Sequence, residues 1–83
     1  MFTRAEILKQ FGLPDRATFG MEPERDPHGI WRIKVSYEGG AAIHMAQGHA
    51  ARLADVIRSV DQRLAKQVDA CIARARRHSQ NSN

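Results

Sequence analysis

The sequence contains a single cysteine, Cys71, only 6% aromatic residues and no long hydrophobic run. A lone cysteine excludes a disulfide within the chain. No segment approaches the ~20 consecutive apolar residues that a membrane-spanning helix needs, and none has the layout of a signal peptide. We therefore expect a protein of the reduced, cytoplasmic compartment that has no contact with membranes.

The length and composition predict one small folded domain. The chain has 83 residues, of which 42% are hydrophobic and 27% are charged. These proportions are ordinary for a globular protein and argue against disorder, while the length leaves room for one modest core. We predict a single domain over residues 1–78 and a frayed polar tail over residues 79–83.

Positive charge is concentrated at the C-terminal end of the sequence. Residues 1–62 contain eight Lys/Arg and eight Asp/Glu, so they are neutral overall. Residues 63–83 contain Asp69 and five basic residues, which are Arg63, Lys66, Arg74, Arg76 and Arg77. This asymmetry predicts a surface that meets a negatively charged partner. The alternative is that these cations only complement the dipole of a helix C-terminus.

A short helix is predicted over residues 4–11. Thr3 and Glu6 have the spacing of a capping box, in which each side chain satisfies a free backbone N–H of the first turn. Gly12 is suited to the left-handed position just after a helix, with Leu13 folding back toward Leu8. Pro14 then prevents the helix from continuing.

Residues 17–46 have the pattern of an antiparallel sheet. Apolar and polar residues alternate through 31–37, the period that a half-buried strand requires. Gly39 and Gly40 predict a tight hairpin into a strand at 41–45. The same alternation over 18–22, followed by a turn cluster, predicts the first strand of a three-stranded meander.

The meander is expected to have one apolar and one polar face. In the second and third strands the polar side would carry Arg32, Lys34 and His44, which predicts a mildly basic outer surface. No aromatic residue falls on that side, whereas sheets that bind single-stranded RNA use exposed aromatics for base stacking.

From about Gly48 to His78 the period changes to that of a helix, without an internal Gly or Pro. The fold class is therefore α+β, with a short N-terminal helix, a three-stranded antiparallel meander and a long C-terminal helix (αβββα). A helix of about 30 residues spans ~45 Å, but an eight-residue strand spans only about 26 Å. Half of the helix would overrun the sheet.

The overrunning half still has an apolar stripe, which includes Leu64, Val68 and Ile72. Something must cover it, because exposed apolar stripes are costly in water. The cover is the first helix, a second copy of the chain, or the second half of the helix itself after a break near Asp61. We favour a homodimer with these three residues as its seam, because the first helix is short.

No constellation of catalytic residues, metal ligands or cofactor-binding residues is present, so we expect neither an enzyme nor a cofactor. Cys71 lies on the apolar stripe, which favours packing over nucleophilic chemistry. The four histidines are scattered, and only His44 and His49 could meet, whereas a zinc site needs three or four converging ligands. Helix-turn-helix and zinc-finger patterns are absent as well.

Binding surfaces remain as the source of function. We predict that partners contact two sets of residues, the outer sheet face and the basic helix end, which are Arg32, Lys34, His44, Arg63, Lys66, Arg74, Arg76 and Arg77. The first hypothesis is a non-catalytic regulator or inhibitor that binds a protein partner stoichiometrically. The second is a nucleic-acid-binding accessory protein that contacts phosphates through its basic helix, and we favour a protein partner over nucleic acid.

In size and plan, this arrangement is similar to small accessory and regulatory proteins of bacteria and their phages, including antitoxins and anti-CRISPR inhibitors. The similarity involves no individual residue. It implies an inhibitor of the phage or mobile-element type, which belongs to the first hypothesis.

Overall fold

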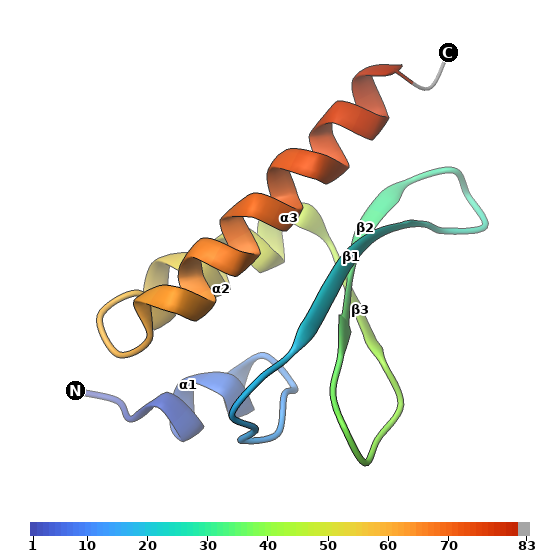
Figure 1. The fold of residues 1–83 in the computed structure, drawn as a ribbon. Coiled ribbons are helices and arrows are strands. Elements are labelled where there is room, and N and C mark those ends of the chain that lie inside the picture. The colour runs from blue at the N-terminus through green and yellow to red at the C-terminus, as the bar shows by residue number, and fades with distance from the viewer. Residues whose placement is uncertain (82–83) are drawn as a thin grey trace.

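The structure is a computed structural model that describes residues 1–81. Its elements follow the order α1 (Arg4–Gln10), β1 (Gly20–Arg25), β2 (Trp31–Ser36), β3 (Ile43–Met45), α2 (Gln47–Ile57) and α3 (Gln62–Asn81). The fold class is α+β, as predicted, with a short N-terminal helix, three antiparallel strands and a helical C-terminal part. Figure 1 shows two layers, with the helical hairpin of α2 and α3 on one face of the sheet and α1 beside α2.

Local hydrogen bonds delimit α1 as the sequence predicts. The Thr3 side chain accepts a hydrogen bond from the Glu6 backbone N–H, and the Glu6 carboxylate accepts one from the Thr3 backbone N–H. At the other end Gly12 has a φ of 76°, and the Leu13 backbone N–H donates to the Leu8 carbonyl at 2.9 Å. Both signals act over a few residues and need no help from the rest of the fold.

The sheet has the order β1-β2-β3, so β2 is central and both neighbours run antiparallel to it. β1 is displaced toward the C-terminus relative to the predicted 18–22, and it includes Pro23. An edge strand tolerates proline because its outer side needs no ladder donor. The hairpin after β2 turns at Gly39, whose φ of 93° is in the left-handed region that favours glycine.

The predicted long helix is two helices. α2 ends at Ile57 and α3 begins at Gln62, so the chain reverses over 58–61 although no Gly or Pro stands there. The backbone N–H of Asp61 donates to the Ile57 carbonyl at 2.8 Å, and its side chain accepts from the Leu64 backbone N–H at 3.0 Å. Asp61 therefore ends one helix and caps the next. α3 also continues through residues 79–81, which were predicted to fray, while residues 82–83 lie outside the described part.

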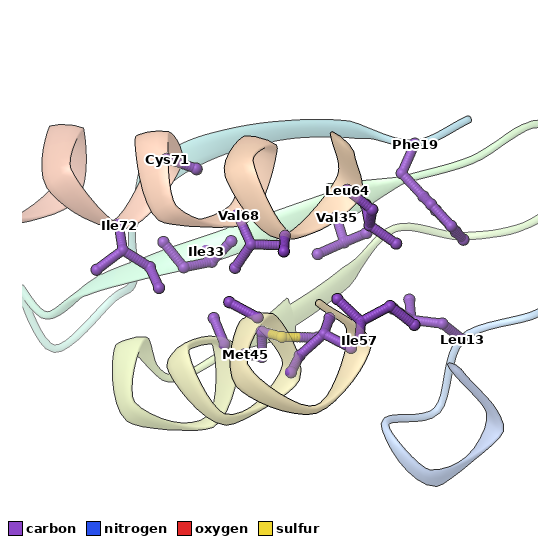
Figure 2. Packing of buried hydrophobic residues seen from close by; sticks show 14 of the residues in the cluster. Leu13, Phe19, Ile33, Val35, Met45, Ile57, Leu64, Val68, Cys71 and Ile72 are labelled. Atoms are coloured by element: carbon purple, nitrogen blue, oxygen red, sulfur yellow. The ribbon is translucent and has the colours of Figure 1, made fainter. Parts of the chain in front are cut away.

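The core forms between the helical hairpin and the inner sheet face. Figure 2 shows Val68 and Ile72 of α3 next to Ile33 and Val35 of β2, with Ile57 of α2 completing the cluster. Ile33 and Val35 are fully buried, which confirms the predicted inner face of β2, and Ile57 of α2 is fully buried against them. Burial of such side chains, worth about 1.5–3 kcal/mol each, explains why the chain folds back instead of continuing as one helix.

Three residues that we predicted as a dimer seam belong to this core. Leu64, Val68 and Ile72 are 4%, 1% and 5% exposed within a single chain. The seam assignment is therefore wrong, because α2 and the sheet already cover these side chains. The break near Asp61, one of the three alternatives, removes the reason for a second copy of the chain.

Candidate functional site

α2 and α3 pack on one face of the sheet, and Figure 1 shows no helix of residues 1–81 on the other, outer face. The strand register determines which side chains share this face. Lys34 of β2 lies opposite Glu22 of β1 and His44 of β3, and Arg32 lies opposite Glu24. The predicted residues Arg32, Lys34 and His44 are thus brought together.

The charge of this face differs from the prediction. We expected a mildly basic surface, but Glu22 and Glu24 of β1 interleave with the cations. Lys34 Nζ lies 3.6 Å from Glu22 Oε1 and 3.5 Å from Glu24 Oε2, and His44 Nε2 lies 3.1 Å from Glu24 Oε1. The face is therefore of mixed sign, and Lys34 and His44 pair with glutamates of β1 across the strands.

These pairs position side chains more than they stabilise the fold. All four groups are solvent-accessible, with side-chain exposures between 31% and 61%. Exposed ion pairs contribute about 0–1 kcal/mol each. Their main effect is on the arrangement of side chains. Glu24 contacts Lys34 and His44 at the same time, which keeps hydrogen-bond donors and acceptors next to each other on an exposed surface.

A hollow of about 570 Å³ lies at the end of this face, beside the turn between β1 and β2. Its lining comes from three segments and consists of Glu24, Arg25, Asp26, Pro27, Arg32 and His44. The carboxylate of Asp26 accepts hydrogen bonds from the backbone N–H groups of Ile30 and His28, both at 2.9 Å. The Ile30 N–H is the largest cause that lowers the pKa of Asp26. Two hydrogen bonds thus hold the Asp26 carboxylate against the backbone of the turn.

The two arginines of the hollow, Arg32 and Arg25, have no carboxylate oxygen of residues 1–81 within 4.0 Å, whereas Lys34 has two carboxylates near it. The charge of Arg32 nevertheless adds to the hydrogen bonds that lower the pKa of Asp26. Arg32 and His44 were predicted from the sequence, but Glu24, Arg25, Asp26 and Pro27 were not, because a turn cluster was expected after the strand 18–22. The missed signal was that the alternation of 18–22 continues through Glu24.

The basic residues of α3 lie on the other side of the molecule. Arg63, Lys66, Arg74, Arg76 and Arg77 are all exposed, and no carboxylate oxygen of residues 1–81 lies within 4.0 Å of their charged groups. The sheet packs on the buried side of α3, so these cations belong to the helical layer and not to the outer sheet face. The structure therefore separates the predicted partner-binding residues into two surfaces.

The structure places the thiol in the core and sets His44 and His49 apart. Cys71 is 2% exposed, and burial raises the pKa of its thiol. His44 is held by Glu24, while the His49 ring packs on Phe11 at 4.8 Å between centroids, so the two histidines do not converge. In residues 1–81 no group of three or more His, Cys, Asp or Glu side chains is placed to hold a metal ion.

Within residues 1–81 there is no helix both long and apolar enough to cross a membrane. Comparison of the chain with protein-family models, with curated proteins and with solved structures found no match.

Proposed function

We propose that this protein is a non-catalytic regulator or inhibitor that binds a protein partner stoichiometrically through the outer face of its sheet. The observation that carries the proposal is the hollow beside Arg32 on a face that the rest of the chain leaves uncovered. A preformed concave site with fixed polar groups loses less conformational entropy on binding than a mobile surface does.

The charge pattern of the face favours protein over nucleic acid as its partner. Glu22 and Glu24 would repel a phosphate backbone, and Glu22 is 61% exposed at its side chain. A protein surface can supply both signs of charge, and complementary charges select the right partner and orient it. The face also lacks exposed aromatic rings on which bases could stack.

Arg32 defines the chemistry expected of the partner. Its guanidinium has no carboxylate within 4.0 Å in residues 1–81, and Arg25 lines the same hollow. A partner carboxylate would form a charge-assisted, bidentate hydrogen bond with one of these arginines, and a partner cation would meet Glu24 or Asp26, which line the same hollow. We therefore propose a partner surface that carries both signs of charge, with an acidic side chain on the arginines and Pro27 as the apolar wall.

The other parts of the proposal are consistent with this role. The similarity in size and plan to inhibitors of the phage or mobile-element type supports a regulatory protein. Cys71 is free and buried, which suits a reducing compartment, so we place the protein in the cytoplasm.

The proposal is tested by capture from a lysate of the source organism with wild type, Arg32→Glu and Arg52→Glu. Arg52 is an exposed arginine on α2, away from the hollow, and provides a matched control. We expect wild type and Arg52→Glu to retain one protein in about equimolar amount. Arg32→Glu should retain at least tenfold less of the same protein.

Circular dichroism should first show that all three proteins fold alike. Hydrogen exchange with the purified partner should then protect β1 and β2 rather than α3. Capture that does not depend on Arg32, or protection confined to α3, would contradict the proposal.

A further inference from the structure

Four of the five basic residues of α3 lie along one side of the helix. With ~100° per residue, Arg63, Lys66, Arg74 and Arg77 fall within an arc of about 80°. Ala70 is the exposed residue between the two pairs of cations. We call these five residues the α3 stripe.

The stripe is directed away from the body of the protein. Its centre lies roughly 160° around the helix from the mean direction of the buried residues of α3, at ~100° per residue. Arg76 does not belong to the stripe, because it lies about 120° from its centre on the flank of Asp69. That flank faces α2, since Asp69 Oδ2 accepts a hydrogen bond from Arg58 at 3.0 Å.

The composition of the stripe indicates the class of its partner. The stripe carries positive charge alone around the small side chain of Ala70, whereas the outer sheet face presents both signs of charge beside a hollow. Helices that lie on membranes need an apolar face toward the lipid, but the apolar side of α3 is buried in the core. Interfaces with nucleic acid are polar and strongly positive, which matches the stripe.

The spacing of the cations fits a double helix. The centres of the pairs Arg63/Lys66 and Arg74/Arg77 are 11 residues apart, which corresponds to ~16 Å along the helix axis. The major groove of B-DNA is about 12 Å wide. A helix laid across the groove would therefore place one pair on the phosphates of each strand, with the small Ala70 side chain over the groove.

We propose that the α3 stripe binds duplex DNA across the major groove through phosphate contacts alone. Binding has little sequence preference, because no side chain that could read a base edge stands at the centre of the stripe. The outer sheet face remains free on the opposite side of the molecule. The inference therefore goes beyond the proposed function, and either can fail without the other.

The test measures binding of the full chain to a fluorescent duplex of about 20 base pairs at several salt concentrations. Four phosphate contacts give a slope of log affinity against log salt of about −3.6, so affinity should fall roughly 150-fold between about 50 and 200 mM salt. Two duplexes of unrelated sequence should bind within about threefold of each other.

Arg77→Ala and Arg76→Ala form a matched pair, because they are exposed neighbours on different sides of α3. We expect Arg77→Ala to reduce the slope by about 0.9 and the double variant Arg74→Ala/Arg77→Ala by about 1.8, with Arg76→Ala unchanged. Arg32→Glu, the variant that tests the sheet face, should bind DNA like wild type.

The proposal is overturned by any of three results. The first is no binding to the duplex at about 50 mM salt. The second is an equal loss of DNA affinity in Arg76→Ala and Arg77→Ala, which would show that the overall positive charge of α3, and not the stripe, causes binding. The third is a polyglutamate peptide competing as well as duplex DNA at equal charge, which would reassign the stripe to an acidic protein surface. Circular dichroism spectra identical to wild type ensure that each variant is folded.

Discussion

Arg4 and Asp61 join the first residue of α1 to the cap of α3. Arg4 Nε donates a hydrogen bond to Asp61 Oδ2 at 2.8 Å, and its Nη1 donates to Asp15 Oδ1 at 2.8 Å. The other oxygen of Asp61 accepts from the Leu64 backbone N–H. One guanidinium thus ties α1, the segment before β1 and the reversal between α2 and α3 together.

This arrangement predicts that Asp61→Ala destabilises the fold by about 2 kcal/mol. Loss of a helix cap costs about 0.5–2 kcal/mol, and loss of the partly exposed ion pair adds up to about 1 kcal/mol. Asp61→Asn retains a capping oxygen and should cost less. Urea unfolding of both variants, alone and combined with Arg4→Ala, measures the coupling. Additive effects of Arg4→Ala and Asp61→Ala would show that the pair does not interact in solution.

The same contact predicts a loss of stability in acid. The hydrogen bond from the Leu64 N–H, followed by that from Arg4, lowers the pKa of Asp61 below its ordinary value of 3.8. A carboxyl whose pKa is lowered by folding stabilises the protein fully above its unfolded pKa, and this stabilisation is lost as the pH falls through the folded pKa. The free energy of unfolding should therefore fall from about pH 5 toward pH 2, and less steeply in Asp61→Asn. Equal slopes for wild type and Asp61→Asn would assign the effect to other carboxyls.

Ile33 and Lys34 are adjacent in β2 but point to opposite faces of the sheet. Ile33→Ala should cost about 2–5 kcal/mol, because Ile33 is fully buried between the sheet and the helices. Lys34→Ala should cost less than about 1 kcal/mol, since it removes only exposed ion pairs. Equal costs in chemical denaturation would mean that the strand register differs from the one described.

Val68→Glu distinguishes a core position from a dimer seam. Val68 is 1% exposed in the single chain, so a glutamate there would bury a charge without a partner and unfold the protein at neutral pH. A seam residue would instead give a folded monomer from a dimer. We expect wild type to sediment as a monomer. A dimeric wild type together with a folded, monomeric Val68→Glu would show that Val68 belongs to a dimer interface after all.

The ring of His78 stacks on Trp31, with centroids 4.4 Å apart and planes 13° apart. Trp31 is the only tryptophan, so its fluorescence reports whether the last turns of α3 lie against β2. His78→Ala should expose the indole and shift its emission to longer wavelength. His49→Ala is the control, because His49 packs on Phe11 and not on Trp31. The tryptophan emission of His49→Ala should match that of wild type. An unchanged spectrum for His78→Ala would show that the stack does not persist in solution.

Features that depend on neighbours in the chain were predictable. The capping box at Thr3 and Glu6 and the left-handed Gly12 use hydrogen bonds between residues only a few positions apart. The inner face of β2 follows from the period of two, which is a property of the strand itself. The separation of Arg76 from Arg77 was available from the helical period too, but grouping the cations by their place in the chain concealed it.

The charge of the outer sheet face was not predictable in the same way. Which residue stands opposite Lys34 depends on the pairing register of β1, and a shift by one residue would move Glu22 and Glu24 to the other face. In that register β1 extends through Pro23, although the sequence around Pro23 has the composition of a turn. The site therefore became visible only once the strands were paired.

The sequence by itself determined the α+β class, the short capped helix, the two-sided central strand and the apolar stripe of the C-terminal region. Only the tertiary structure decided what covers that stripe. A helix continuing through Asp61 and a helix broken there satisfy local preferences about equally, since Asp61 is a good cap but no Gly or Pro forces the break. The choice depends on burial of Leu64, Val68 and Ile72 against strands that lie about 30 residues earlier in the chain, and such long-range packing leaves no local trace in the sequence.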